Sequence, residues 1–335
     1  MTLFRLLTEG SRALEQSGDP DASQDARLLL LAAFHLDMAH FLLNRMETLE
    51  ENAYNKAATA LYRDMLKRRR RRCPLQHILG CQEFMGLEFR VNRHVLIPRQ
   101  DTETLVELAL EESRKERRRS LLDLCTGSGC IAVSMAAKGD FWRVVATDIS
   151  GEALKVARGN AGRLLEGWTI EGPQKAGEPE NGKKKESMGQ RPGHAQQHQW
   201  EPGYSNQERE KGRQMAFLQG DLFGALQGSR DKFDIITANP PYIPTSVIAT
   251  LEPEVRDHEP KMALDGSKDG LCYYRRIAAG AGRWMNPGGS LYLEIGNSQG
   301  EAVSGLLEKE GFACVQVYRD LAGHDRVVAA RKEGV

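Results

Sequence analysis

The stretch LLDLCTGSGC, residues 121–130, reads as a short apolar strand that runs into a glycine-containing turn and then into an apolar helix. Glycines in such a turn let the backbone come close to a ligand, because they carry no side chain. From Ser120 onward, strand patterns alternate with helical patterns along the chain. This alternation is typical of a doubly wound α/β sheet, so the stretch predicts the first strand of a ligand-binding domain.

Further apolar runs after this strand are separated by helical segments and turn signals. Asp148 ends the second predicted strand, and Asp221 follows the third. In open α/β sheets, ligands bind at the carboxyl ends of the strands, so both acids are candidate binding residues. Together the runs predict a seven-stranded, mostly parallel sheet with strands at residues 121–124, 143–147, 214–218, 233–238, 290–295, 312–318 and 326–330.

The fourth strand, residues 233–238, ends at Asn239-Pro240-Pro241-Tyr242. The two prolines have no N–H to donate, so the strand must stop there. The four residues form a stiff turn that holds an amide and an aromatic ring at the carboxyl end of the strand. Such a turn suits the gripping of a planar polar group, either an amide or an amino-bearing base.

A glycine turn after the first strand and an acid after the second occur in sites for dinucleotides and in sites for S-adenosylmethionine. The third glycine of the dinucleotide pattern is absent, since position 132 is alanine. Asp221 lies where the edge of an adenine would lie, and the turn at Asn239 would stand beside a methyl donor. These three features favour S-adenosylmethionine.

The first part of the chain reads as helical. Apolar residues recur at helical spacing in three segments up to about residue 66, which predicts a small helical domain over residues 1–80. An alternating stretch with Gly86 in its middle predicts a β-hairpin linker over residues 81–93, before a main domain at 94–335. Asp101 or Thr102 is expected to cap a helix that runs to about residue 119.

A segment of low apolar content interrupts the main domain at residues 163–213. Gly, Pro, Gln, Glu, Lys and His dominate it, so it buries too little apolar surface to offset the entropy of ordering. We therefore expect a disordered loop, inserted between the second helix and the third strand of the sheet.

Charge and cysteine content limit the classes of function. The formal net charge of the 335 residues is zero, so no overall field draws the protein to nucleic acid or membrane. The basic run at residues 67–72 is predicted to be a solvated helix end, with phosphate binding as the alternative. No secretory signal and no apolar run of about 20 residues is recognisable. The six cysteines form no C-x-x-C pair and have no histidine at metal-ligand spacing, which predicts reduced thiols, no metal site and a cytoplasmic location.

The order and content of these motifs resemble the release factor glutamine methyltransferase family, the HemK/PrmC type of N5-glutamine methyltransferase. The resemblance implies a class I S-adenosylmethionine-dependent methyltransferase with a Rossmann-like fold and an N-terminal helical domain that docks the substrate. It also implies N5-methylation of the glutamine in the Gly-Gly-Gln motif of peptide chain release factors, which act in translation termination. The similarity covers nearly everything outside residues 163–213 and is carried by PLQHILG at 74–80, EFMGL at 83–87, LIPR at 96–99, DLCTGSG at 123–129, Asp148, NPPY at 239–242, RDHEP at 256–260, ALDG at 263–266, LEIG at 293–296 and DLAGHDR at 320–326.

The resemblance further implies roles for single residues. Asp148 would bind the ribose of the cofactor, and Asp221 and Leu222 would lie by the adenine. Asn239 would touch both cofactor and substrate, and its side-chain oxygen would accept a hydrogen bond from the glutamine NH₂. The other residues expected near the methionine part of the cofactor are Arg99, Thr102, Cys125, Thr126, Gly127, Ser128 and Gly129. Catalysis would fall to Asn239, Pro240 and Tyr242, and substrate binding to these three and Pro241. The Pro240 carbonyl would be a second acceptor, and the Tyr242 ring would lie against the amide plane.

Three different functions share parts of this pattern. The same turn could hold an extruded base in an N6-adenine or other amino-methyltransferase that acts on nucleic acid, and the basic runs at 67–72 and 114–119 would favour this. Against it stand the zero net charge and the lack of a recognisable target-recognition domain. The second is a sister enzyme that methylates glutamine in a ribosomal protein, and the third is a cofactor-binding protein without catalysis.

Overall fold

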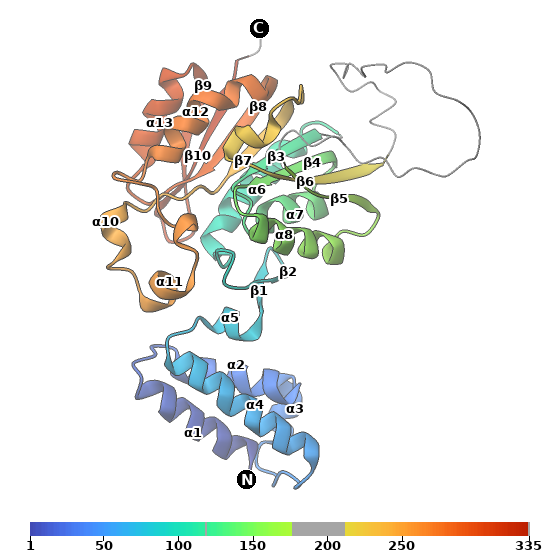
Figure 1. Cartoon of the computed structure of the whole chain (residues 1–335), viewed down its shortest axis with the longest axis vertical. Helices are drawn as coiled ribbons and strands as arrows, with labels where there is room; N and C mark the ends of the chain where they lie inside the picture. Colours follow the sequence, from blue (N-terminus) through green and yellow to red (C-terminus); the bar gives the residue numbers. More distant parts are fainter. Residues whose placement is uncertain (118, 176–211, 334–335) are drawn as a thin grey trace, which may run out of the picture.

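The computed structural model describes residues 1–117, 119–175 and 212–333, and these fold into two parts (Figure 1). Helices within residues 3–79 form a helical region, and a large sheet covered by helices forms a sheet region. Figure 1 shows the two stacked along the long axis, with α5 and the β1–β2 hairpin between them. The expected Rossmann-like α/β fold with an N-terminal helical part is confirmed.

The helices and strands have the following bounds. The helical region contains α1 Leu3–Glu15, α2 Ala22–Phe34, α3 Met38–Asn44, α4 Ala53–Arg70 and α5 Leu75–Leu79. The later helices are α6 Glu103–Ser113, α7 Cys130–Lys138, α8 Gly151–Leu164, α10 Thr245–Ile248, α11 Pro253–His258, α12 Cys272–Trp284 and α13 Gly300–Lys309, with 3-10 helices η1 Gln100–Thr102, η2 Leu222–Leu226 and η3 Lys261–Ala263. The strands are β1 Cys81–Phe84, β2 Leu87–Arg90, β3 Arg119–Leu124, β4 Phe141–Asp148, β5 Trp168–Lys175, β6 Arg213–Gln219, β7 Phe233–Ala238, β8 Met285–Glu294, β9 Phe312–Arg319 and β10 Asp325–Lys332.

The large sheet has the strand order β5-β6-β4-β3-β7-β8-β10-β9 among the described residues. The strands from β5 across to β8 pair in parallel, and β10 runs antiparallel to both β8 and β9. The strand order reverses between β3 and β7, which are neighbours although they are far apart in the chain. Such a switch point opens a crevice at the carboxyl ends of the strands, so the turns after β3 and β7 face the same space.

β5 makes the sheet one strand larger than the seven-stranded sheet that the sequence predicted. It comes from residues 163–213, which were expected to be a disordered loop, and this expectation is wrong for residues 168–175. Trp168 packs against the Arg213 guanidinium at 5.8 Å, and Ile170 pairs with Met215 of β6. The sequence did not predict this strand, because the segment as a whole is polar and only Trp168, Thr169 and Ile170 favour a strand. Residues 176–211, the rest of the predicted loop, lie outside the described residues.

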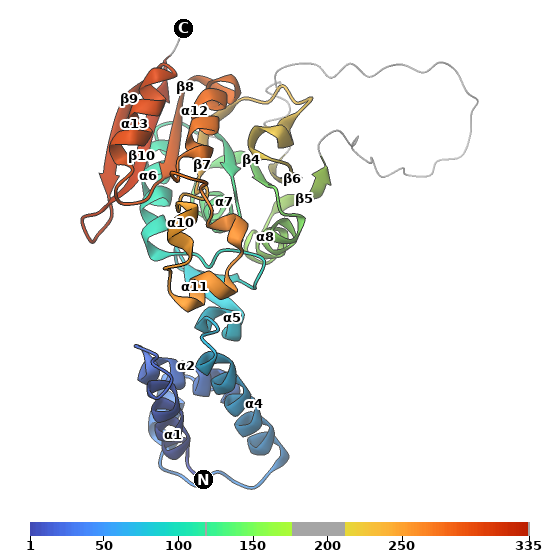
Figure 2. The ribbon, with the colours of Figure 1, turned by 60° about the vertical axis from the view of Figure 1, so that its left-hand side comes forward.

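Helices cover both faces of the large sheet, as Figures 1 and 2 show. On one face α6, α7 and α8 pack with buried side chains of the sheet such as Phe141 and Phe217. On the other face α12 and α13 pack, with Tyr274 and Ile277 at the centre of the contact. Every residue of β3 is buried, as expected for a central strand that is covered on both faces.

The helical region has an apolar core of its own. Leu6, Leu14, Leu29 and Tyr62, from α1, α2 and α4, are buried in it. The sequence predicted these three helices but missed α3 and α5, which are too short to show a clear hydrophobic period. No single helix in the described ranges is long and apolar enough to span a membrane, although α2 and α3, which meet at 92°, meet those criteria as a pair.

The basic run at residues 67–72 is not simply a solvated helix end, and this prediction is wrong for two of its arginines. Arg69 is only 6% exposed, because it faces three carboxylates. Arg72 pairs with Glu252 and Glu254. Arg69 lies on the buried side of α4, while Arg70 stays exposed. Arg72 lies two residues beyond the end of this helix, with a φ of 61°, so helical spacing does not explain its position.

β1 and β2 form the predicted hairpin. Met85 and Gly86 have φ values of 53° and 70°, which belong to a two-residue type I′ turn. Phe84 and Phe89 pack edge to face and join the core of the sheet region. The buried side chain of Asn160 in α8 also hydrogen-bonds the backbone N–H and C=O at the end of β2. The hairpin is therefore fastened to the sheet region.

Candidate functional site

A cleft lies at the carboxyl ends of β3, β4, β6 and β7. Its volume is about 930 Å³, which includes the solvent at its open mouth. This is the crevice at the switch point of the sheet, where ligands bind in open α/β folds. Most of the residues that were predicted to bind cofactor or substrate meet here. Those that line the cleft are Arg99, Thr102, Cys125, Thr126, Gly127, Ser128, Asp148, Asp221, Leu222, Asn239 and Pro241.

The turn after β3 forms one wall of the cleft. Cys125 and Gly127 have φ values of 56° and 54°, a left-handed region that is strained for cysteine and easy for glycine. A side chain added at Gly127 would meet nothing within 4 Å, so the backbone there borders open space. The Thr126 N–H donates to the Thr147 carbonyl at 2.9 Å and holds the turn against β4. A ligand can therefore lie directly on this backbone.

Gly129 lies behind the turn and does not line the cleft. Its φ is 80°, and a Cβ at this position would lie 3.0 Å from the Cβ of Ala157 in α8. The glycine therefore lets α7 begin close against α8. Contact of Gly129 with the cofactor was predicted, but the structure gives this residue a packing role.

Asp148, the last residue of β4, is fixed by the backbone around it. Its Oδ2 accepts a hydrogen bond from the Gly127 N–H at 2.9 Å, and its Oδ1 accepts one from the Ser150 N–H at 2.8 Å. Burial raises the pKa of this carboxyl, while the two N–H groups favour its charged form. Each oxygen keeps a further lone pair, so Asp148 can accept hydrogen bonds from two neighbouring hydroxyls, such as those of a ribose.

The segment after β6 forms the opposite wall. Asp221 is half exposed, and its carboxylate pairs with Arg276 of α12 at 2.7 Å. Leu222 is buried with a φ of 49°, and Tyr273 adds an aromatic face to the lining. An apolar and aromatic surface with one acid at its edge suits a purine ring that carries an amino group.

The turn from Asn239 to Tyr242 is held from outside by two other segments. The Ile243 N–H donates to the Leu264 carbonyl at 3.0 Å. The Gln299 side chain donates to the Tyr242 carbonyl at 3.1 Å. Both prolines of the turn are buried. The acceptors of this turn are therefore held in place before any ligand arrives.

This turn separates two cavities. Asn239 and Pro241 line the cleft, whereas Tyr242 lines a neighbouring polar cavity, and Pro240 lines neither. Burial raises the pKa of Tyr242 to about 12, so its hydroxyl stays protonated at neutral pH. The residues that line the polar cavity are Gln76, Gln82, Ile97, Pro98, Arg99, Gln100, Asp101, Tyr242, Glu294 and Arg326, of which Pro98 and Arg99 also line the cleft.

Thr102 and Arg99 approach the turn from the segment before α6. Thr102 was predicted as a possible helix cap, but its side chain makes no capping hydrogen bond. Its hydroxyl lies instead 3.5 Å from Nδ2 of Asn239. Arg99 pairs with the buried carboxylate of Glu259 at 2.6 Å. The helix that follows ends at Ser113, earlier than predicted.

Glu294 lines the polar cavity beside the Asn239 turn, although the sequence-based interpretation assigned it no role. The parallel register of β7 and β8 pairs Ala238 with Leu293. Asn239, directly after β7, therefore lies beside Glu294, the last residue of β8. Glu294 is 1% exposed. Burial raises its pKa to about 7, although Thr102 and Asn239, among others, favour its charged form. The signal in the sequence was an acid at the end of the strand next to the Asn239 turn.

Residues 5–80 match a family model described as the PrmC N-terminal domain. A release factor glutamine methyltransferase from Moorella thermoacetica is 38% identical over 335 aligned residues, which cover 99% of this chain and 100% of that protein. Another from Geobacter sulfurreducens is 36% identical over 330 residues, covering 98% of this chain and 96% of that protein. A solved structure of a release factor-specific protein-(glutamine-N5) methyltransferase from Alicyclobacillus acidocaldarius shows 26% identity, coverage of 73% of this chain and 99% of that chain, and a TM-score of 0.36. Because these two relatives are more than 30% identical along almost their entire length, this chain belongs to the release factor glutamine methyltransferase family.

Proposed function

We propose that this protein transfers a methyl group from S-adenosylmethionine to the side-chain nitrogen of the glutamine in the Gly-Gly-Gln motif of a peptide chain release factor. Relatives that match nearly the whole chain carry the name of this activity. The observation that carries the proposal is the turn at residues 239–242, which presents Asn239 to the cleft and Tyr242 to the polar cavity. A group on this turn is within reach of two reactants that enter from different sides.

The cleft residues fit the methyl donor. When bound, S-adenosylmethionine supplies an electrophilic methyl group. The open backbone at Gly127 supports a role in holding the methionine part, together with its neighbours in the turn. Asp148 binds the ribose hydroxyls with the lone pairs that its backbone contacts leave free. Leu222 covers the adenine, and Asp221 accepts a hydrogen bond from its amino group.

The residues of the turn prepare the glutamine for reaction. An amide nitrogen is a poor nucleophile, because its lone pair is delocalised into the carbonyl group. The Asn239 side-chain oxygen and the Pro240 carbonyl accept hydrogen bonds from the glutamine NH₂ and aim its nitrogen at the cleft. As the nitrogen–methyl bond forms, the bond between the methyl group and the cofactor sulfur breaks, and S-adenosylhomocysteine leaves. The same acceptors favour the positive charge that develops on this nitrogen, which then loses one proton to solvent. Tyr242 packs against the amide plane in its neutral form.

The lining of the polar cavity supports an amide substrate over a nucleobase. Enzymes that act on an extruded base stack it between aromatic or apolar side chains. Along this cavity, as far as the chain is described, Tyr242 is the only aromatic residue. The glutamine side chains and charged groups around it offer hydrogen bonds to a polypeptide. The lining of this cavity therefore gives no support for a nucleic acid substrate.

Recognition of the release factor body falls to residues 1–80, with 81–93 as the linker and 94–335 as the methyltransferase domain. The helical region presents apolar side chains to solvent on and beside α3, among them Leu42, Leu43 and Met46 at 50%, 78% and 67% exposure. Exposed apolar groups that gather in this way suit a protein partner. The proposed substrate acts in translation, and this supports a cytoplasmic location for the enzyme.

The test is a methylation assay with labelled S-adenosylmethionine and several acceptors side by side. They are purified release factor, a release factor variant with Gln→Ala in its Gly-Gly-Gln motif, total ribosomal protein and DNA. We expect label on the release factor and none on its variant. Labelling of ribosomal protein or DNA, with none on the release factor, would overturn the proposal.

A further inference from the structure

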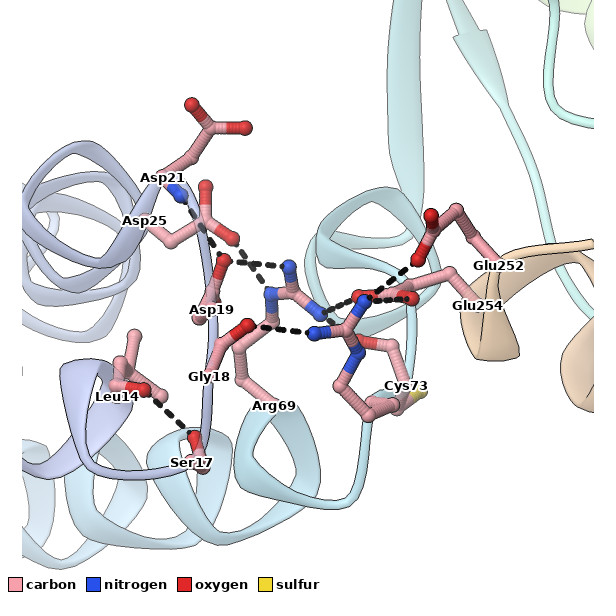
Figure 3. A network of polar contacts seen from close by, with 11 residues as sticks. Leu14, Ser17, Gly18, Asp19, Asp21, Asp25, Arg69, Cys73, Glu252 and Glu254 are labelled. Atoms are coloured by element: carbon pink, nitrogen blue, oxygen red, sulfur yellow. Dashed lines mark hydrogen bonds and ion pairs between the residues drawn. The ribbon is translucent and has the colours of Figure 1, made fainter.

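Arg69 joins the two parts of the molecule through three ion pairs. Its Nη2 contacts Asp19 at 2.9 Å and its Nε contacts Asp25 at 2.5 Å, and both acids belong to the helical region. Its Nη1 contacts Oε1 of Glu254, on α11 of the sheet region, at 2.7 Å. Figure 3 shows the guanidinium between the two groups of carboxylates. One buried cation therefore holds acids from both parts.

Arg72, two residues beyond the end of α4, reinforces the contact. Its Nη2 lies 2.7 Å from Oε2 of Glu254 and 3.2 Å from the more exposed Glu252. Its Nη1 donates to the Gly18 carbonyl at 2.8 Å. Burial disfavours the charged form of Glu254, but hydrogen bonds from Arg69 and Arg72 outweigh it and lower the pKa of this carboxyl. Glu254 is thus ionised at neutral pH, with both oxygens held by the helical region.

α11 leads from this ion pair to the functional site. Glu259 directly follows the helix, and its buried carboxylate holds Arg99 at 2.6 Å. Arg99 lines both the cleft and the polar cavity. Pro260 and Met262, next along the chain, also line the cleft. The segment from Glu254 to Met262 therefore contacts the helical region at its start and lines the cleft at its end.

Besides these ion pairs, α5 and the β1–β2 hairpin connect the two regions in the described parts of the chain. The apolar core of the helical region is separate from the cores on both faces of the sheet. A cavity with charged walls lies between the regions, lined by Asp25, Arg69, Arg99, Glu254 and Glu259 among others. Domains without a shared apolar interface are expected to move relative to each other unless specific contacts hold them.

We propose that the ion pair between Arg69 and Glu254 is a latch that positions the helical region for catalysis on a protein substrate. It holds the orientation in which a docked release factor presents its glutamine to Asn239. This inference rests on the proposed function and on docking by residues 1–80. The cofactor binds wholly within the sheet region, and a short peptide with the Gly-Gly-Gln motif needs no docking. Loss of the latch therefore weakens productive binding of the release factor alone, because fewer molecules are in the competent orientation.

Glu254→Gln is the decisive variant, because it removes the charge on the sheet side only. Arg69 keeps Asp19 and Asp25, so the buried pairs of the helical region persist. Replacement of Arg69 would instead leave carboxylates buried without their cation and could unfold the region. The matched control is Glu252→Gln, in the same segment but with a side chain that is 78% exposed. An exposed ion pair of this kind contributes little.

The assay compares both variants with wild type on release factor and on the short peptide. For Glu254→Gln we expect KM for the release factor to rise roughly tenfold, with kcat within a factor of about two. Affinity for S-adenosylmethionine and turnover of the peptide should stay at the wild-type level. Small-angle X-ray scattering should show a larger radius of gyration for this variant, while Glu252→Gln matches wild type throughout.

Two results would overturn the latch, provided that wild type methylates the release factor. One is an unchanged KM and scattering curve for Glu254→Gln. The other is an equal rise of KM for peptide and release factor, because it would place the damage in the site itself. Wild-type protein that leaves the release factor unmethylated would overturn the proposed function instead.

Discussion

The carboxylate of Asp148 accepts a hydrogen bond from the backbone N–H of Gly127, and this 2.9 Å contact joins the ends of β4 and β3 at the edge of the cleft. The acid that is proposed to bind the ribose thus also shapes the turn that is proposed to bind the methionine part. Its other oxygen holds the Ser150 N–H at the start of α8. Removal of this one side chain should disturb two parts of the cofactor site together.

Asp148→Ala should weaken S-adenosylmethionine binding roughly 10- to 100-fold, since hydrogen bonds to a charged group each contribute about 1.5–3 kcal/mol. Isothermal titration calorimetry would measure the dissociation constant. Asp221→Ala is the matched comparison, because Asp221 is half exposed and already paired with Arg276. Its effect should be smaller. Equal affinities of Asp148→Ala and wild type would remove Asp148 from the cofactor site.

Asn239→Ala should lower kcat for release factor methylation roughly 10²–10³-fold, the usual effect of losing one preorganised hydrogen-bonding group. Cofactor affinity should change by no more than roughly fivefold, because the contacts of the amide go to two neighbouring protein groups, the Thr102 hydroxyl and the Glu294 carboxylate. Single-turnover rates at saturating cofactor would separate the two effects.

Asn286→Ala serves as the control for loss of a partly buried asparagine. Asn286 lies at the start of β8, where its amide donates to Asp234 at 2.6 Å, away from the cleft. Its turnover should equal that of wild type. Near-wild-type turnover of Asn239→Ala would mean that the turn does not hold the reacting nitrogen.

Much of the cleft could be predicted because the ends of parallel strands meet at one edge of a sheet. Once the strand order is recognised, the groups that follow the strands must lie near one another. Gly127, Asp148, Asp221 and Asn239 each stand at or just after such an end. Local chemistry therefore specified this part of the site.

Contacts between distant segments could not be predicted in the same way. Arg69 stands in a run of six cations, and nothing in the run tells which of them is buried. Its partner Glu254 is 185 residues away, so tertiary packing decides the pairing. Threonine is a common helix cap, but the hydroxyl of Thr102 accepts a hydrogen bond from the Asn239 side chain instead. β5 forms because β6 provides an edge with which a short strand can pair.

Glu294 predicts a pH dependence of the methyl transfer rate. Burial raises its pKa to about 7, while Thr102, Arg326 and Asn239 favour its charged form. The ionised carboxylate attracts the amide nitrogen of Asn239 and so leaves the amide oxygen for the substrate. Since the ionised fraction increases as pH rises through about 7, kcat should increase over the same range. Glu294→Gln should lose this rise and be roughly tenfold slower above pH 8.

The pH profile of kcat needs a control, because Asp123 is a second buried acid with a pKa raised to about 7. Asp123→Asn should keep the rise of kcat with pH, since Asp123 lies below the turn and does not line the cleft. If the rise of kcat persists in Glu294→Gln and disappears in Asp123→Asn, the titrating group is Asp123 and the prediction for Glu294 is wrong.

Asp123 should instead contribute to the pH dependence of folding stability. Burial between the central strands raises its pKa from 3.8 to about 7, even though Thr237 donates to its Oδ1 at 2.7 Å. Between these two pH values the folded chain keeps a proton that the unfolded chain has lost, so the free energy of unfolding falls as pH rises. The loss of stability is complete above about pH 7.

In Asp123→Asn the introduced amide does not titrate, and its oxygen can still accept a hydrogen bond from the Thr237 hydroxyl. The free energy of unfolding of Asp123→Asn relative to wild type should therefore rise by about 3 kcal/mol between pH 5 and pH 8, at about 1.4 kcal/mol per pKa unit. Urea unfolding of both proteins at the two pH values would measure it, and a difference that does not change with pH would show that Asp123 is ionised throughout.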